Sequence, residues 1–370
     1  MPVIVLIVLM VLTGCTRDPQ DQNLRVSNDH QLSGPKIQFL GVGGWLLHWK
    51  GEGLMLAPSF SNPSLFGLRG VPSPLVLANE RKIDDAMRDV PDAADVRMLL
   101  VGHGHYDHLL DVPIIVRKYT PQATIYGSET VKHILQGFDE LKRFPVVDVQ
   151  DDMAKLKGFG EPGPLMKEGQ WFPSPSGRIR VMPIQSEHAG HVAGLNLVPG
   201  DYHTDLTKPE LSLWRWKPGQ SLAWVIDLMD DAGKYPVYRI HYQDSAATPP
   251  LGYMPALADG KGVDVEILCA SSWKQVRHYP QRVLERHRPR MVLIGHWENF
   301  FGNDPHEPRL LVGQDVRSMI RVVQTTVGPQ VPVVLPAPLS EVRFPAPEKK
   351  TAPLKGSGFS WRSPISRGGR

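Results

Sequence analysis

Short apolar runs separated by pairs of glycines open the part of the chain that we expect to fold. The runs at 37–40, 45–49 and 54–56 are rich in aliphatic and aromatic residues, and they predict three successive antiparallel strands. From 80 to 90 the apolar positions follow a helical period, and the mainly apolar run at 96–101 predicts a buried strand. This strand leads directly into a group of histidines, which places that group at the strand's carboxyl end.

The same order of strands and then helices recurs later in the chain. We expect helices at 109–119, 129–136, 281–287 and 310–325, and strands at 123–126, 179–184, 222–226, 237–242, 263–268 and 291–294. Two batches of strands, each followed by helices, predict an α/β protein in which two sheets pack face to face with helices outside, a four-layer αβ/βα sandwich. Segments 151–175 and 199–220 are expected to lie over the core as insertions.

Composition narrows the function classes. With 41% hydrophobic and 21% charged residues among 370, the chain is typical of an ordinary globular protein and excludes disorder throughout. The net charge of +3 is not gathered into a basic stripe interleaved with aromatics, so we expect no nucleic-acid partner. The only cysteines are Cys15 and Cys269, which rules out a disulfide framework, and Cys269 ends an apolar run typical of a buried strand.

The N-terminus has the pattern of an export signal. Residues 3–12 are apolar but too few to span a bilayer, and they end at Leu12-Thr13-Gly14-Cys15. This run resembles a bacterial lipoprotein signal, although no Lys or Arg precedes it, and the resemblance implies that Cys15 carries the lipid that anchors the protein to the membrane of the cell envelope. A simple secretory signal is the alternative.

Side chains that can bind metal are most concentrated in the run Gly102-His103-Gly104-His105-Tyr106-Asp107-His108. Alternation along an extended backbone directs His103 and His105 to one side, so both can reach one ion, while Asp107 and His108 can turn toward a second. Imidazole and carboxylate together suit Zn²⁺ or a related divalent ion. The sequence therefore predicts a metal site at the end of the strand at 96–101.

This run matches the His-x-His-x-Asp-His signature of the metallo-β-lactamase superfamily, which the chain resembles from about residue 37 to 336. The resemblance implies two metal ions and three later ligands, each placed just beyond a strand: His188 for the first ion, Asp244 as a carboxylate that bridges the two ions, and His296 for the second ion. His191 competes with His188, and Asp227 competes with Asp244, although a turn position is a sufficient explanation for Asp227. One position departs from the pattern, because Ala57-Pro58 stands where many relatives have Asp-Pro.

Together, the N-terminal pattern, the superfamily resemblance and the basic, Gly-, Ser- and Pro-rich C-terminus divide the chain into a signal peptide (1–15), a linker (16–35), a metallo-β-lactamase-like hydrolase domain (36–345) and a basic disordered tail (346–370). The superfamily resemblance implies a hydrolase in which two divalent ions activate water; we expect Zn²⁺, with Mn²⁺ or Fe²⁺ as alternatives. Asp107 is the expected catalytic residue, which orients the water and accepts its proton while binding metal. Tyr106, Trp297 and, if it is not a ligand, His191 are expected to face the substrate.

The signature with Tyr106 is similar to that of N-acyl phosphatidylethanolamine phospholipase D and its bacterial relatives. This implies a phosphodiester or phospholipid-like substrate, which an enzyme tethered to a membrane would meet. Hydrolysis of a lactone, amide or other ester is the alternative, since one scaffold supports several reactions. A zinc-binding envelope protein without turnover is a third hypothesis.

Overall fold

The computed structural model describes residues 26–158, 160–161, 165–190, 196, 198–311 and 313–347. Cys15, His191 and the tail from 348 onward lie outside the described residues, so the lipid anchor, the role of His191 and the disordered tail stay predictions. Among the residues described, no helix combines the length and the apolar composition needed to cross a bilayer.

The first large sheet has seven strands and grows from the apolar runs at the start of the fold. Its strand order is β17-β2-β3-β4-β5-β6-β7. The three predicted strands form the antiparallel meander β2 to β4, and β4, β5, β6 and β7 then pair in parallel. The bounds are β2 Lys36–Gly41, β3 Gly44–Trp49, β4 Glu52–Leu56, β5 Val96–Leu100, β6 Thr124–Gly127, β7 Val146–Asp148 and β17 Glu341–Arg343.

The second large sheet has eight strands in the order β1-β16-β15-β14-β13-β12-β11-β10. From β13 to β1 all neighbours are parallel, whereas β10 to β13 are antiparallel. The bounds are β1 Val26–Ser27, β10 Phe172–Pro173, β11 Ile179–Gln185, β12 Leu222–Met229, β13 Pro236–Gln243, β14 Val265–Cys269, β15 Met291–Gly295 and β16 Val333–Pro336. Strands β8 Lys155–Leu156 and β9 Met166–Lys167 form a separate pair.

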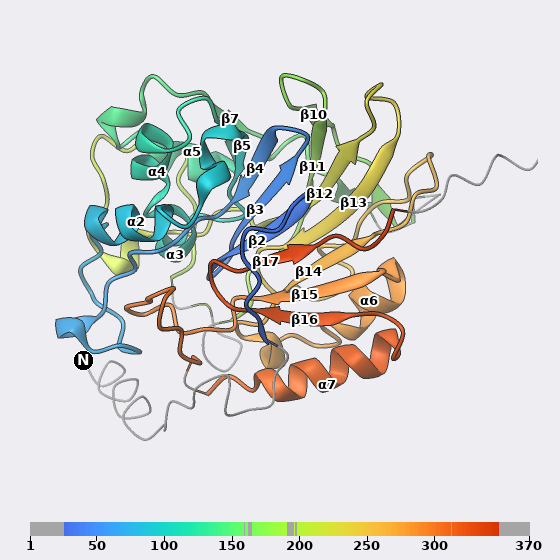
Figure 1. Ribbon diagram of the computed structural model, residues 1–370. Helices are drawn as coiled ribbons and strands as arrows, with labels where there is room; N and C mark the ends of the chain where they lie inside the picture. Colours follow the sequence, from blue (N-terminus) through green and yellow to red (C-terminus); the bar gives the residue numbers. More distant parts are fainter. Residues whose placement is uncertain are drawn as a thin grey trace, which may run out of the picture.

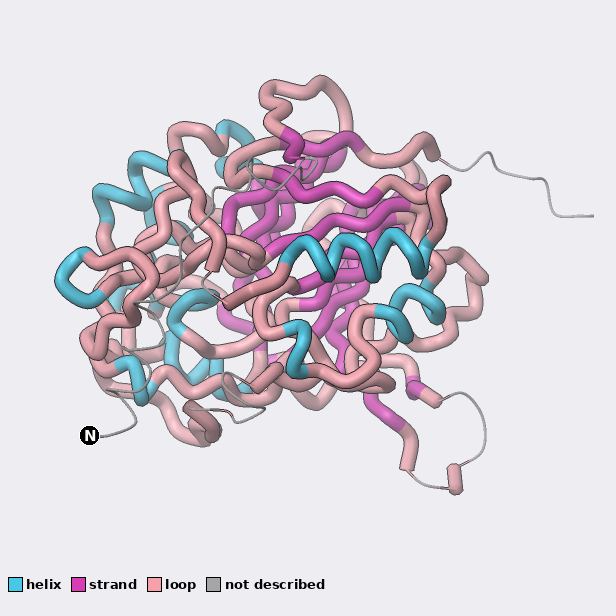
Figure 2. Tube along the Cα trace, turned by 90° about the horizontal axis from the view of Figure 1, so that it is seen from below, coloured by secondary structure: helices cyan, strands magenta, loops and turns pink. Residues whose placement is uncertain are grey.

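Helices cover the outer faces of both sheets, which gives four layers. Side chains from β2 to β5 and from β11 to β15 share one large buried cluster between the sheets, and a second cluster joins the first sheet to its helices. Figures 1 and 2 show the strands at the centre with helices on either side. The predicted α/β sandwich of two packed sheets is therefore confirmed.

The helices are α2 Glu80–Met87, α3 Tyr106–Leu109, α4 Val112–Lys118, α5 Glu129–Leu135, α6 Gln281–His287 and α7 Val316–Val327. Short 3₁₀ turns occur at η2 Leu65–Gly67, η3 Pro91–Asp95, η4 Asp139–Leu141, η5 Leu213–Arg215 and η6 Trp273–Gln275.

Several predicted boundaries shift by a few residues, and two shift further. The fold begins inside the predicted linker, because Val26 and Ser27 pair with Leu335 and Pro336 of β16. The last helix starts at Val316 instead of 310, because the side chain of Asp315 accepts a hydrogen bond from the backbone of the first turn and caps the helix there. The first boundary depends on a strand partner that is remote in sequence. The second depends on a helix cap that lies inside a continuous apolar pattern.

Asp227, the rival ligand, lies inside β12 and not in a turn, and its contacts explain it fully. Both of its oxygens accept hydrogen bonds from the buried guanidinium of Arg239, and Arg180 donates to the same carboxylate. Asp259 completes this group by accepting from Arg239. Asp227 is therefore one member of a buried ion-pair network, and the structure does not bring it to the histidines.

We expect Asp227→Asn to lower the free energy of unfolding by about 3 kcal/mol, because it leaves the buried Arg239 charge undercompensated. The control is Asp231→Asn, which breaks the exposed pair with Lys50 and should change stability by less than about 1 kcal/mol. Urea unfolding followed by fluorescence measures both changes. Equal losses in the two variants would contradict a special role for the buried network.

Candidate metal centre

The centre lies at the edge where strands of both sheets end. The signature run follows β5, His188 follows β11, Asp244 follows β13 and His296 follows β15. Strands β13, β14 and β15 are parallel, and β11 runs in the same direction as β13 because two antiparallel pairings separate them. Their carboxyl ends consequently share one edge, which brings together side chains that are far apart in sequence.

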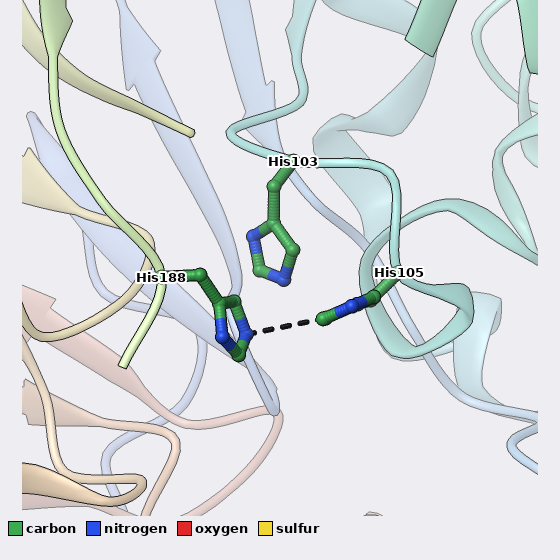
Figure 3. Close-up of side chains that lie close together, drawn as sticks. All are labelled: His103, His105 and His188. Atoms are coloured by element: carbon green, nitrogen blue, oxygen red, sulfur yellow. Dashed lines mark hydrogen bonds between the residues drawn. The ribbon is translucent and has the colours of Figure 1, made fainter. Parts of the chain in front are cut away.

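The first group of donors consists of His103, His105 and His188, and Figure 3 shows the three rings converging. Nδ1 of His105 lies 3.1 Å from Nε2 of His188, and the ring of His103 lies 4.8 Å and 4.7 Å from the other two rings. Nε2 of His103 is buried without a hydrogen-bond partner among the described residues. A buried lone pair in such a position calls for a proton donor or a cation.

The second group consists of Asp107, His108 and His296. Nε2 of His108 lies 3.2 Å from Nε2 of His296, and these two nitrogens lie 3.5 Å and 3.4 Å from the Oδ2 atom of Asp107. An ion with tetrahedral bonds of about 2.0–2.1 Å holds its ligand atoms roughly 3.3 Å apart. The spacing of these donors therefore fits a zinc-type ion. His103 adjoins this group, since it offers a ligand atom within 4.8 Å of those of Asp107 and His108.

Asp244 connects the two groups. Its oxygens accept hydrogen bonds from Nδ1 of His103 at 2.5 Å and from Nδ1 of His108 at 3.0 Å. With Nδ1 donating to a carboxylate, each ring keeps the lone pair of Nε2 for a metal. The structure thus places Asp244 where it orients two predicted ligands, and the prediction that it also binds both ions directly stays a prediction.

The electrostatics of the centre favour a bound positive charge. Burial lowers the pKa of His108, but the carboxylates of Asp244 and Asp107 outweigh this effect and raise that pKa to about 9. Burial raises the pKa of Asp107 and of Asp244, yet the neighbouring histidines hold both well below the usual range of a carboxyl group. Both carboxylates are therefore ionised at neutral pH, and metal ions could replace the protons of the imidazoles.

A cavity of about 280 Å³ opens onto both groups. Polar ligands form one end, and much of the remaining wall is apolar: Val198, Leu213, Trp214, Phe300, Phe301 and Leu311. Tyr106 lines the cavity, and its buried hydroxyl has no partner among the described residues; its contact with a substrate stays a prediction. The prediction for Trp297 is corrected: its side chain is 1% exposed, does not line the cavity and donates to the carbonyl of Pro336.

Sequence reasoning missed several residues that shape the centre. The hydroxyl of Tyr242 lies within hydrogen-bond distance of both Asp244 and the carbonyl of Gly43, and its single proton can be donated to either one. A side chain at Gly102 would meet the carboxylate of Asp244 at 2.3 Å, and one at Gly43 would meet the ring of His108 at 2.7 Å. The glycine before the signature was visible in the sequence, but its close approach to Asp244 depends on how the two sheets bring the end of β5 beside the end of β13.

Asp111 was also missed, and it bears on the loop that departs from the family pattern at Ala57. Its carboxylate accepts hydrogen bonds from the backbone amides of Phe60 and Ser61 and from the hydroxyl of Ser61. A carboxylate supplied by the segment after the signature therefore fixes the loop after β4.

A third group of histidines lies apart from the centre, where α6 packs on the second sheet. Glu266 accepts hydrogen bonds from Nδ1 of His241 and of His287, and Nε2 of His287 accepts from the backbone of Met254. Burial raises the pKa of Glu266, but the two histidines outweigh this and lower it to about 2. Because both ring nitrogens of His287 are engaged, we assign this group to packing of the helix.

No protein-family profile matches the chain, and no curated protein sequence matches it. Solved structures do match. A metallo hydrolase from the hyperthermophilic archaeon Ignicoccus hospitalis is 12% identical, with 83% of this chain and 97% of the other covered and a TM-score of 0.45. A metallo-β-lactamase fold protein from Bacillus subtilis is 11% identical, with coverage of 84% and 99% and a TM-score of 0.46. Isothiocyanate hydrolase from Delia radicum gut bacteria is 12% identical, with coverage of 84% and 99% and a TM-score of 0.46.

We expect the purified protein to bind about two equivalents of Zn²⁺, and His103→Ala and His296→Ala each to lose about one, because each variant removes a donor from a different group. Metal analysis after dialysis measures the stoichiometry. His133→Ala is the control, since His133 pairs with Asp205 away from the cavity. Unchanged zinc content in both variants would contradict the assignment of the donors.

Gly102→Ala should weaken zinc binding without unfolding the protein, because the new methyl group would displace the carboxylate of Asp244. Gly262→Ala is the matched control, since a side chain there would meet nothing within 4 Å. Zinc titration of the two variants and their melting temperatures give the comparison. Equal affinities would show that the position of Asp244 is not critical.

Proposed function

We propose that the chain is a metal-dependent hydrolase of the metallo-β-lactamase superfamily, with two zinc-type ions. The observation that carries this proposal is the spacing of Asp107, His108 and His296, whose three donor atoms lie 3.2 to 3.5 Å apart. The adjacent imidazoles of the first group and the match to the His-x-His-x-Asp-His signature support a second ion beside the first. An accessible cavity next to both groups favours catalysis over a purely structural use of the metals.

The first ion would be held by His103, His105 and His188, and the second by Asp107, His108 and His296, with Asp244 shared or orienting. Two bound divalent ions supply Lewis acidity, which polarises the bond under attack and brings the pKa of water near neutrality. The ionised carboxylate of Asp107 can accept a proton from water and orient it. Tyr106 lines the cavity, so its ring can pack against the substrate.

The substrate we propose is a phosphodiester on an amphiphilic molecule, such as a phospholipid. The cavity supports this choice because a polar, cation-binding end adjoins a wall that includes Trp214, Phe300 and Phe301. The similarity of the signature to the N-acyl phosphatidylethanolamine phospholipase D-like branch points in the same direction. We further propose that the enzyme works in the bacterial cell envelope, anchored through Cys15, which the N-terminal pattern supports.

We expect hydrolysis of bis(p-nitrophenyl) phosphate that disappears on chelation and returns when zinc or manganese is added. Asp107→Asn should lower turnover by at least about a hundredfold, because it removes both a ligand and the proton acceptor. Release of p-nitrophenol measures the rate, and His133→Ala is the control. Lactone, amide and carboxylic ester substrates are assayed in parallel. Faster turnover of these substrates would replace the phosphodiester as the proposed substrate class. If metal-loaded protein hydrolysed neither these substrates nor the phosphodiester, the proposal of a hydrolase would be rejected.

A further inference from the structure

Large exposed apolar side chains are gathered at one place on the protein. Of eight such residues among those described, six lie in segments 64–77 and 211–216, and we call these six the apolar rim: Phe66, Leu68, Leu75, Leu77, Leu211 and Trp214. The two segments are joined by backbone hydrogen bonds from Val76 to Leu211 and from Leu213 to Pro74. A cluster of this kind on a soluble surface marks a contact with another apolar phase.

The apolar rim is continuous with the wall of the cavity. Pro72, Leu213 and Trp214 line the cavity, and the amide of Gly70 donates to the carbonyl of Phe301, which also lines it. A molecule that leaves an apolar phase at the rim would therefore reach the metal centre without crossing open water. In Figure 1 the blue segment around residue 66 projects from the lower left of the molecule.

Phe66 shows that this exposure is built into the backbone. Its side chain is 91% exposed, and its φ of 49° lies in the left-handed region that non-glycine residues rarely adopt. Both features oppose the stability of the isolated fold, since a bulky aromatic residue gains neither packing nor relaxed backbone there. Local strain of this sort is typical of functional segments.

We propose that the apolar rim inserts into the surface of a lipid bilayer and so places the cavity mouth against its substrate. The proposal that the rim enters the bilayer rests on these exposed side chains. The proposal that the bilayer supplies the substrate rests on the proposed function. The N-terminus supports this occupant. The eleven residues from Cys15 to Val26 can extend by at most roughly 40 Å, so a lipid on Cys15 would keep the fold against the membrane.

Two further observations favour a bilayer over a protein partner. A stable protein interface takes roughly 20–30 residues from each side, and six side chains on two loops are far fewer. The arginines of the two segments are also neutralised, because Arg69 pairs with Asp304 and Glu307 and Arg215 pairs with Glu210. Insertion of apolar side chains, with little dependence on salt, is therefore the expected mode.

The first test places a polarity-sensitive thiol fluorophore on the rim of the full chain, reconstituted in vesicles of phosphatidylcholine and phosphatidylglycerol. Leu68→Cys carries the label, and Tyr235→Cys is the matched control, since Tyr235 is 60% exposed on the β12–β13 turn, at the opposite end of these strands from Asp244. The parent chain gives the background from Cys15 and Cys269. We expect a blue shift and quenching by nitroxide-labelled lipid at position 68 only, in low and in high salt.

Equal spectra at positions 68 and 235, or quenching that high salt abolishes, would overturn insertion. Self-association through the rim, detected as cross-linking of labelled position 68 between copies without quenching, would overturn it as well. This readout does not require activity, so it stands or falls separately from the proposed hydrolase.

The second test separates docking from chemistry. Phe66→Ser combined with Leu68→Ser should lower the hydrolysis of vesicle-borne phospholipid at least about tenfold, because even partial transfer of two apolar side chains into lipid exceeds the free energy of a factor of ten. Hydrolysis of soluble bis(p-nitrophenyl) phosphate should stay unchanged, because neither residue lines the cavity. Tyr235→Ser is the control for both substrates. An equal fall with both substrates, or no fall with vesicles, would contradict the proposal.

Discussion

Two carboxylates and five imidazoles are gathered at one edge of the two sheets, and the balance of charge among them is the constraint on which the rest of the structure depends. A carboxylate removed from water is strongly unfavourable unless a positive charge compensates it. Here His108 provides positive charge, so its pKa is raised while those of Asp107 and Asp244 are lowered; burial lowers the pKa of His103 and of His296. The lone pairs on the imidazole nitrogens that bind protons are the same lone pairs that bind divalent metal ions.

The architecture brings this charge together by ending its strands in one place. Each sheet supplies donors from loops that follow a strand, and the strands themselves are fixed by the apolar cluster that both sheets share. The close approach of the donors also requires glycine at two positions. Gly43 leaves room for His108, and Gly102 leaves room for Asp244. The rigid core and the crowded centre are thus consequences of one packing arrangement.

The surroundings of the centre differ in character from the centre itself. Toward the solvent, the cavity wall becomes aromatic and continues into exposed apolar loops, of which Phe66 is the extreme case. Away from the centre, buried charged side chains are paired, as in the network of Asp227 and Arg239 and in the group around Glu266. The cavity therefore has a charged end, formed by the histidines and aspartates, and an apolar end at the apolar rim. This arrangement matches an amphiphilic substrate better than a wholly polar one.

The sequence by itself determined the order of the main strands and helices and the local donor set from His103 to His108, because periodicity and short-range spacing are properties of neighbouring residues. It also indicated His188, Asp244 and His296, through resemblance and position after strands. Only the tertiary structure decided that Asp227 binds arginines, that Trp297 packs inside and that Val26 belongs to a sheet. The orientation of Asp244 and the exposure of Phe66 were equally beyond the sequence, since both depend on contacts between segments that no local pattern encodes.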